Sequence, residues 1–131
     1  MTDELVITAP LATHFINTEV FCTLQIEATH NWPNCPFREV LYLRDPHRHV
    51  FYIKAHKLVS HDDRHIEFIC LKHDIKQYIH EQYWSQTIKM CEFGAKSCEM
   101  LGRELAEHFD LSQVEVSEDN ENGSVVYRKR I

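Results

Sequence analysis

Hydrophobic and polar residues alternate along two stretches in the first half of the chain. Every second side chain is apolar between Phe21 and His30, and the same period of two, with many aromatic and β-branched residues, continues from His47 to Val59. This period is typical of strands that bury one face. We therefore expect strands over Phe21–His30 and His47–Val59. A shorter strand over His65–Ile69 is expected to pair with the second as a hairpin.

Two later segments carry apolar residues at intervals of three and four, which is the spacing of an amphipathic helix. The first set is Leu71, Ile75, Tyr78, Ile79 and Tyr83, and the second is Cys98, Leu101, Leu105 and Phe109. These stripes predict one helix that ends near Trp84 and a second that begins near Ser97.

The end of the chain has the pattern of a hairpin. Two short strands, Val114–Ser117 and Ser124–Lys129, flank an Asn-Gly turn signal within 120–123. The whole order predicts an α+β protein with an antiparallel sheet and its helices on one face. The length of 131 residues suits one domain, which we place at 19–131 after an N-terminal arm at 1–18.

Charge and hydropathy narrow the range of partners. The formal charge of −6, from 14 basic and 20 acidic residues, repels phosphate backbones, so nucleic acid is not the expected partner. No apolar run approaches the roughly 18–20 residues that span a bilayer, and the first residues do not resemble a secretory signal. We expect a cytoplasmic protein without a membrane partner.

Histidine and cysteine content points to metal chemistry of a particular kind. The five cysteines include no Cys-x-x-Cys pair, which argues against a disulfide framework and a four-thiolate zinc site. Ten histidines are many for a chain of this length, so a metal site that uses imidazoles is worth testing.

A candidate metal site follows from the strand pattern. His47 and His49 lie two residues apart on a strand and therefore project from the same face, and His30 at the end of the preceding strand is placed to join them. Three imidazoles with an open fourth position are typical of catalytic zinc centres. The alternative interpretation is that His49 packs in the core and His47 lies on the surface.

Several short segments resemble the 6-pyruvoyl tetrahydropterin synthase family, which includes the 6-carboxytetrahydropterin synthases. The similar segments cover about residues 20–130 in the family's order, and the spacing of the three histidines is the most specific of them. They are Ile26-Glu27-Ala28-Thr29-His30, His47-Arg48-His49-Val50-Phe51, His65-Ile66-Glu67-Phe68-Ile69-Cys70-Leu71-Lys72, Ser97-Cys98-Glu99-Met100, and Val114-Glu115-Val116-Ser117-Glu118-Asp119 with Tyr127.

The resemblance implies a tunnelling fold (T-fold), with a four-stranded antiparallel sheet and two helices on one face. It further implies a homo-oligomer, a trimer or a hexamer, whose sheets close a barrel with zinc at the subunit interface. His30, His47 and His49 would be the zinc ligands. Glu118 matches the glutamate that anchors a pterin ring, a role that suits a carboxylate because it accepts two parallel N–H bonds.

The catalytic residues of the family are less well matched. Leu43 stands where the family has its cysteine base, and no Asp-His pair follows the first helix. Cys35, earlier in the same loop, is a candidate replacement, because a nearby cation would lower the pKa of its thiol. The alternative is an inert loop thiol.

Three functional interpretations remain open. In the first, the protein is a zinc-dependent lyase or hydrolase that acts on a pterin or purine-derived compound, with Cys35 or a zinc-bound water as base. Alternatively it binds such a ring without turnover, or the histidines only pack and the oligomer is a scaffold. The enzyme is the leading interpretation, because three imidazoles with an open position suit catalysis.

Overall fold

A computed structural model describes residues 17–128. Its frame is a pair of 13-residue antiparallel strands, β2 (Thr18–His30) and β3 (His47–Val59), which pair along their whole length from Thr18↔Val59 to His30↔His47. The strand predicted over His47–Val59 is confirmed. Of the predicted arm at 1–18, residues 1–16 lie outside the described part, and Thr18 already begins β2.

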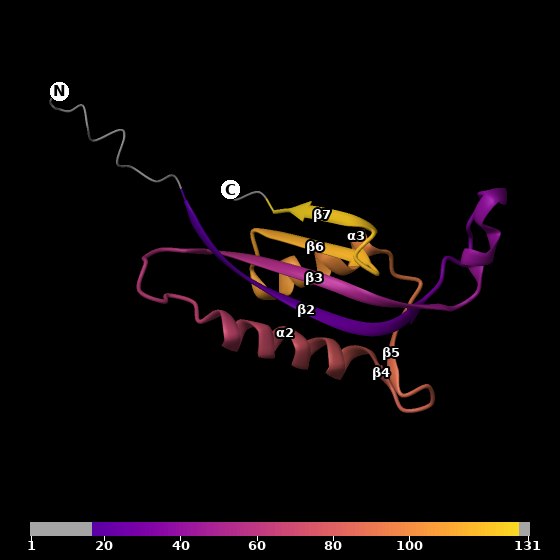
Figure 1. Cartoon of the computed structure of the whole chain (residues 1–131), viewed down its shortest axis with the longest axis horizontal. Helices are drawn as coiled ribbons and strands as arrows, with labels where there is room; N and C mark the ends of the chain where they lie inside the picture. Colours follow the sequence, from indigo (N-terminus) through magenta and orange to yellow (C-terminus); the bar gives the residue numbers. More distant parts are fainter. Residues whose placement is uncertain (1–16, 129–131) are drawn as a thin grey trace, which may run out of the picture.

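One open sheet forms around this pair, with the strand order β4-β5-β2-β3-β6-β7. β6 (Gln113–Glu118) adds antiparallel to β3, and β7 (Asn122–Tyr127) adds antiparallel to β6. β5 (Met90–Gly94) adds parallel to β2, and the two-residue β4 (Trp84–Ser85) closes that edge. Figure 1 shows β7 and β4 at the two edges.

The predicted four-stranded antiparallel sheet closing a barrel is therefore wrong. The described residues form one six-stranded mixed sheet that stays open, with three helices. The additional strands come from 84–94, where Cys91 and Phe93 alternate with exposed residues and pack into the core. A strand of five residues gives a weak periodic signal, and its parallel partner, β2, is far away in sequence.

The strand predicted over His65–Ile69 is also wrong. Residues 60–67 form a turn region, and helix α2 (Phe68–Tyr83) begins directly after it. Glu67 decides this boundary, because its side chain accepts a hydrogen bond from the Cys70 backbone N–H and so caps the helix. Alternation over only five residues does not outweigh such a cap.

The turn of the C-terminal hairpin lies earlier than predicted. Asp119 and Asn120 take the left-handed conformation, with φ of 55° and 59°, and make the turn between β6 and β7. Gly123 instead lies within β7, where a Cβ atom would stand 2.1 Å from the carbonyl oxygen of Val116. The glycine is required there by close packing, not by the turn.

Both long helices cover the same face of the sheet. α2 lies along β2, and α3 (Cys98–Phe109) packs on β6 and β7, as Figure 1 shows. Alternating strand residues fill the space between, among them the fully buried Ala28, Phe51, Ala55, Val114 and Val116. His30, His47, His49 and Glu118 continue these same rows at one end of the sheet. No described helix is long and apolar enough to cross a membrane.

The opposite face of the sheet has no helix on it within residues 17–128. Phe21, Val125 and Tyr127 are exposed there, the last to 74%.

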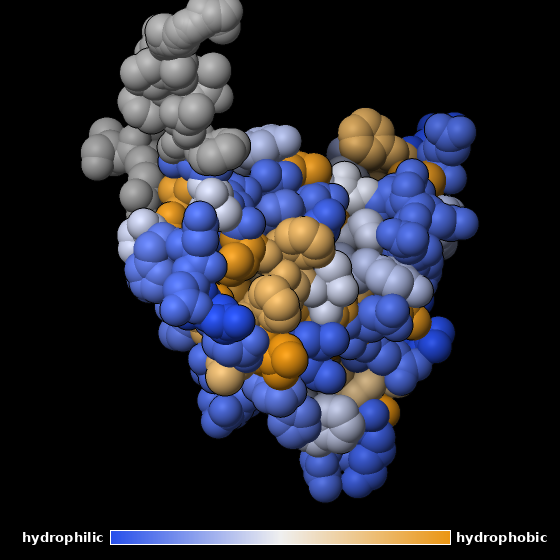
Figure 2. Space-filling model, turned by 60° about the vertical axis from the view of Figure 1, so that its left-hand side comes forward, coloured by the Kyte–Doolittle hydropathy of each residue, from blue (hydrophilic) through white to orange (hydrophobic). Residues whose placement is uncertain are grey.

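A short 3-10 helix, η1 (Arg38–Arg44), lies in the long connection between β2 and β3 and projects beyond the sheet in Figure 1. In Figure 2 an apolar patch occupies the middle of the displayed face, with polar side chains around it.

A polar cluster joins α2, α3 and the turn before α3. Glu104 accepts hydrogen bonds from the hydroxyls of Tyr78 (2.7 Å) and Tyr83 (2.5 Å) and from the Lys96 ammonium (2.8 Å). Burial alone would raise the pKa of Glu104, but these three donors outweigh it and lower the pKa. The Glu104 hydrogen bond raises the pKa of Lys96 to about 12.

We predict that Glu104→Gln lowers the free energy of unfolding by about 2 kcal/mol at neutral pH, because a charged acceptor of three bonds is lost. Glu104 has a lowered pKa in the folded state, so its contribution is complete above its unfolded pKa of about 4.3 and disappears as acid protonates the folded carboxylate. Urea unfolding, measured from neutral pH into acid, should therefore show the free energies of unfolding of wild type and variant becoming equal in acid. Glu107→Gln, an exposed neighbour on α3, is the control and should stay near wild type; equal stability of the Glu104 variant at neutral pH would contradict the prediction.

Candidate metal centre

Strand register brings the three predicted histidines together. His30 is the last residue of β2 and lies opposite His47, the first residue of β3, while His49 lies opposite Ala28. All three side chains point to the helix-covered face because they share the alternation of Ala28 and Phe51. Their ring centroids are 4.6 to 5.4 Å apart, and the rings meet edge to face.

The three imidazoles can offer one metal-binding atom each. These atoms all lie within 4.8 Å of one another, so the rings are close enough together to hold a metal ion. Nitrogens bound to a tetrahedral ion at 2.0–2.1 Å are about 3.3 Å apart, a distance that small ring rotations would reach.

Each ring is held by a hydrogen bond from its Nδ1 atom. His30 donates to the carbonyl oxygen of Lys96 (3.0 Å), and His47 donates to that of Asp45 (2.9 Å). His49 donates to the Asp119 carboxylate (2.7 Å). Such partners are typical of metal-binding histidines, because they fix the tautomer that leaves Nε2 free as a ligand atom.

The Nε2 atoms of His30 and His49 are buried and have no hydrogen-bond partner. Only 8% of the His30 surface is exposed. Burial would lower the pKa of His30, but the Glu118 carboxylate and the Lys96 carbonyl together raise it. A buried ring nitrogen without a partner is costly unless a proton or a metal ion satisfies it. The orphaned nitrogens therefore fit a bound cation.

Asp119 was not among the predicted site residues, although it supports His49 directly. One carboxylate oxygen accepts from the His49 ring and the other from the Val50 backbone N–H (3.0 Å), and its own N–H donates to the Val50 carbonyl. The Val50 hydrogen bond, followed by that of His49, lowers the pKa of Asp119. Its place directly after Glu118 was the sequence signal that could have identified it. The sequence contains no such signal for the Lys96 and Asp45 carbonyls, because every residue has a backbone carbonyl.

Glu118 lies at the end of β6, on the same face as the histidines, and lines a pocket beside them. This pocket has a volume of about 470 Å³, and its lining includes His30, His47, Trp32, Cys98 and Glu118. The adjacent His30 ring lowers the pKa of Glu118, so the side chain is an anion at neutral pH. Burial and the Glu118 charge raise the pKa of Cys98 to about 12.

Cys35 lies elsewhere in the connection between β2 and β3. It is fully buried, and its thiol points to the backbone carbonyls of Phe37 (3.9 Å) and Val40 (3.6 Å). The Arg44 side chain donates two hydrogen bonds to the Cys35 carbonyl oxygen, which fixes this part of the loop. The pocket beside the histidines does not include Cys35 among its lining residues. Its catalytic role stays a prediction.

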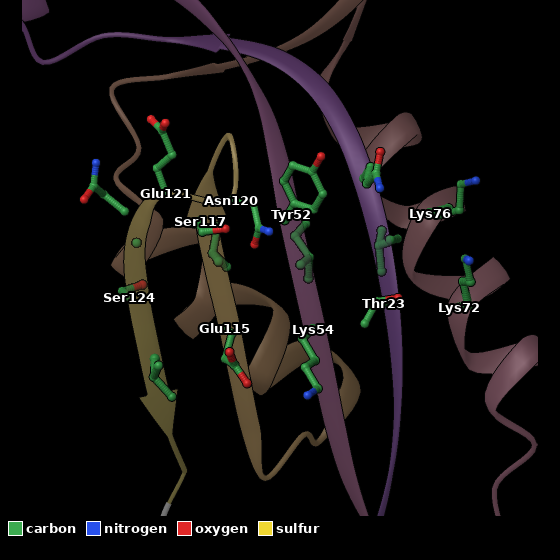
Figure 3. A pocket seen from close by; sticks show the side chains of 17 residues that line it. Thr23, Tyr52, Lys54, Lys72, Lys76, Glu115, Ser117, Asn120, Glu121 and Ser124 are labelled. Carbon is green, nitrogen blue, oxygen red and sulfur yellow. The ribbon is translucent and has the colours of Figure 1, made fainter.

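A second, larger hollow of about 660 Å³ lies mostly on the uncovered face of the sheet. Figure 3 shows Tyr52, Lys54, Glu115 and Ser117 projecting into it from neighbouring strands, with Lys72 and Lys76 on the adjacent helix. None of the three clustered histidines lines this hollow. Of these two hollows, the smaller one is the candidate site, because its lining includes His30 and His47.

Comparison with known proteins establishes the fold alone. No family model matches the sequence. No curated protein matches it either. The chain is similar in structure to the uncharacterized protein WS1659 from Wolinella succinogenes, with a TM-score of 0.67 over 88% of this chain and 100% of that one. The two sequences are 9% identical.

We predict that Asp119→Asn weakens Zn²⁺ binding about 10- to 100-fold, because the anionic acceptor that orients His49 is lost. Asparagine tolerates the left-handed backbone of this position and keeps an oxygen for the Val50 N–H, so the turn should survive. Zn²⁺ affinity is measured by competition with a chelator. Asp74→Asn, an exposed position on α2, is the control, and equal affinities of the Asp119 variant and wild type would refute the prediction.

Proposed function

We propose that this protein is a zinc-dependent enzyme with lyase-type chemistry, similar in activity to 6-pyruvoyl and 6-carboxytetrahydropterin synthases, acting on a pterin or purine-derived compound. The observation that carries the proposal is the cluster of three histidines, each with Nδ1 already bonded, at the edge of a pocket that also holds Glu118. His30, His47 and His49 would hold the ion. When bound, zinc would supply a Lewis acid and lower the pKa of coordinated water.

Glu118 would select the organic ligand. A pterin or guanine ring presents a 2-amino group beside a ring N–H, and a carboxylate accepts both in a bidentate pair. Trp32, 43% exposed on the pocket lining, offers an aromatic surface for such a ring. The Lys96 ammonium is engaged by Glu104, so the anionic Glu118 dominates this part of the pocket and favours a ligand edge that donates hydrogen bonds.

A ligand-binding protein without turnover is the second candidate. The specific observation in its favour is Cys35, whose buried thiol faces backbone carbonyls, together with Leu43 in the family's cysteine position. Release of triphosphate from a dihydropterin triphosphate distinguishes the two candidates. The enzyme releases triphosphate with turnover, whereas the binding protein holds the compound unchanged. Turnover that persists in Cys35→Ser would exclude the thiol as the base.

The proposal predicts that pterin binding depends on the histidine cluster. Zinc-loaded wild type should bind pterin in calorimetry. His47→Ala should lose zinc and bind pterin at least about tenfold more weakly, because the ion that would hold the oxygen atoms of the ring compound is lost. His73→Ala, an exposed histidine on α2, is the matched control. Equal pterin binding by wild type and His47→Ala would contradict the proposed function. A wild-type protein that does not bind zinc would contradict it as well.

We also propose that the protein forms a homo-oligomer. The support is the sheet face that no described helix covers, on which the apolar side chains of Phe21 on β2 and of Val125 and Tyr127 on β7 are exposed. Sedimentation equilibrium should give a mass that is a multiple of the chain mass, with Val125→Lys shifting the equilibrium towards the monomer. A wild-type mass equal to one chain would refute this proposal.

A further inference from the structure

The Glu118 carboxylate stands directly against two of the clustered rings. Its Oε2 atom is 3.0 Å from His30 Nε2, and its Oε1 atom is 3.4 Å from His49 Nε2. Neighbouring ligands on a tetrahedral zinc ion with bonds of about 2.0–2.1 Å are separated by about 3.3 Å. The two carboxylate oxygens therefore stand at ligand-to-ligand distances from the two imidazole nitrogens.

These contacts are attractive only when positive charge lies between the groups, either as a proton on each ring or as a shared metal ion. His30 and His49 each donate from Nδ1, so in the neutral imidazole Nε2 is an acceptor that faces another acceptor, a carboxylate oxygen. Neither Nε2 atom has a partner in hydrogen-bonding geometry. Two imidazoles would each have to hold an additional proton to make the contacts attractive. One divalent ion satisfies both nitrogens and the carboxylate together.

Glu118 is also accessible to an organic ligand, because it lines the same pocket as His30 and His47. Its side chain is 30% exposed, and the Cys98 thiol donates to its Oε2 atom over 3.9 Å. A carboxylate in this position borders the histidine cluster on one side and the pocket on the other. It can therefore exchange between a metal ion and the N–H edge of a ring without movement of the backbone.

We propose that Glu118 is the fourth metal ligand while the pocket is empty, and that an incoming pterin or purine ring takes over this carboxylate and frees a coordination position. This inference rests on the proposed function, which it extends by a mechanism that opens the metal site only when a ligand is present. Glu118 then has two successive partners. The four-ligand site without substrate would be closed to other small molecules.

The test uses Co²⁺ alone as the probe, because its visible spectrum reports its ligands. In the absence of organic ligand, Glu118→Gln should bind Co²⁺ at least about tenfold more weakly than wild type and show a shifted spectrum, since an anionic ligand is lost. Glu99→Gln, at the start of α3 on the same pocket, is the control and should match wild type. Adding pterin should shift the wild-type spectrum and leave that of Glu118→Gln unchanged.

Three results would overturn the inference. Equal Co²⁺ affinity and spectrum in wild type and Glu118→Gln would remove Glu118 from the coordination sphere while leaving the histidine site intact. A sulfur-to-cobalt charge-transfer band that disappears in Cys98→Ser would show that the thiol is the fourth ligand. Absence of Co²⁺ binding by wild type would refute the metal centre and the inference together. Thermal melting checks that the variants fold. If Glu118→Gln does not fold, Glu118→Asp replaces it, because the shorter side chain keeps the charge but moves it away from the histidines.

Discussion

The structure around the candidate site depends on three imidazole rings whose Nδ1 atoms each donate a hydrogen bond to the protein. The Lys96 and Asp45 carbonyls and the Asp119 carboxylate hold the rings, and the remaining nitrogens face one another at the end of the sheet. Without a cation, the buried Nε2 atoms of His30 and His49 lack partners beside a negative carboxylate. These contacts need positive charge, which one divalent ion can supply to both rings at once, and this need is the physical basis of the proposed metal centre.

The rest of the fold holds this arrangement in register. Thirteen-residue pairing of β2 with β3 fixes His30 opposite His47, and a shift by one residue would turn the histidines to the other face. β6 adds Glu118 to the same row, and the turn after it supplies Asp119. The turn that contains Lys96 is tied by its side chain to Glu104 on α3. Contacts from a helix, a turn and the strands together fix the orientation of the three histidine rings.

The sequence predicted those features that depend on local periodicity. Alternation placed His47–Val59 in one strand, and the same rule put His47 and His49 on one face. It failed for 65–69, where a single capping side chain, Glu67, starts a helix. It also missed β5, whose partner β2 lies more than sixty residues earlier, a pairing that local pattern does not encode. The family resemblance implied a sheet that is too small and closed, because it contained no counterpart for 84–94.

The candidate site was predictable to a similar degree. His-x-His spacing with a preceding strand-end histidine identified the cluster, since strand geometry converts spacing into direction. Asp119 was missed because its role depends on a left-handed turn that brings it back to β3. Cys35 was selected for its place in the loop, but the direction of its thiol depends on contacts with Phe37 and Val40 that composition does not reveal.

The most direct test of the central claim is X-ray absorption at the zinc edge of the purified, zinc-loaded protein. The account predicts one tightly bound ion per chain whose first shell contains three imidazole nitrogens at about 2.0–2.1 Å. A first shell without imidazole scattering, or a protein that does not retain zinc, would contradict it.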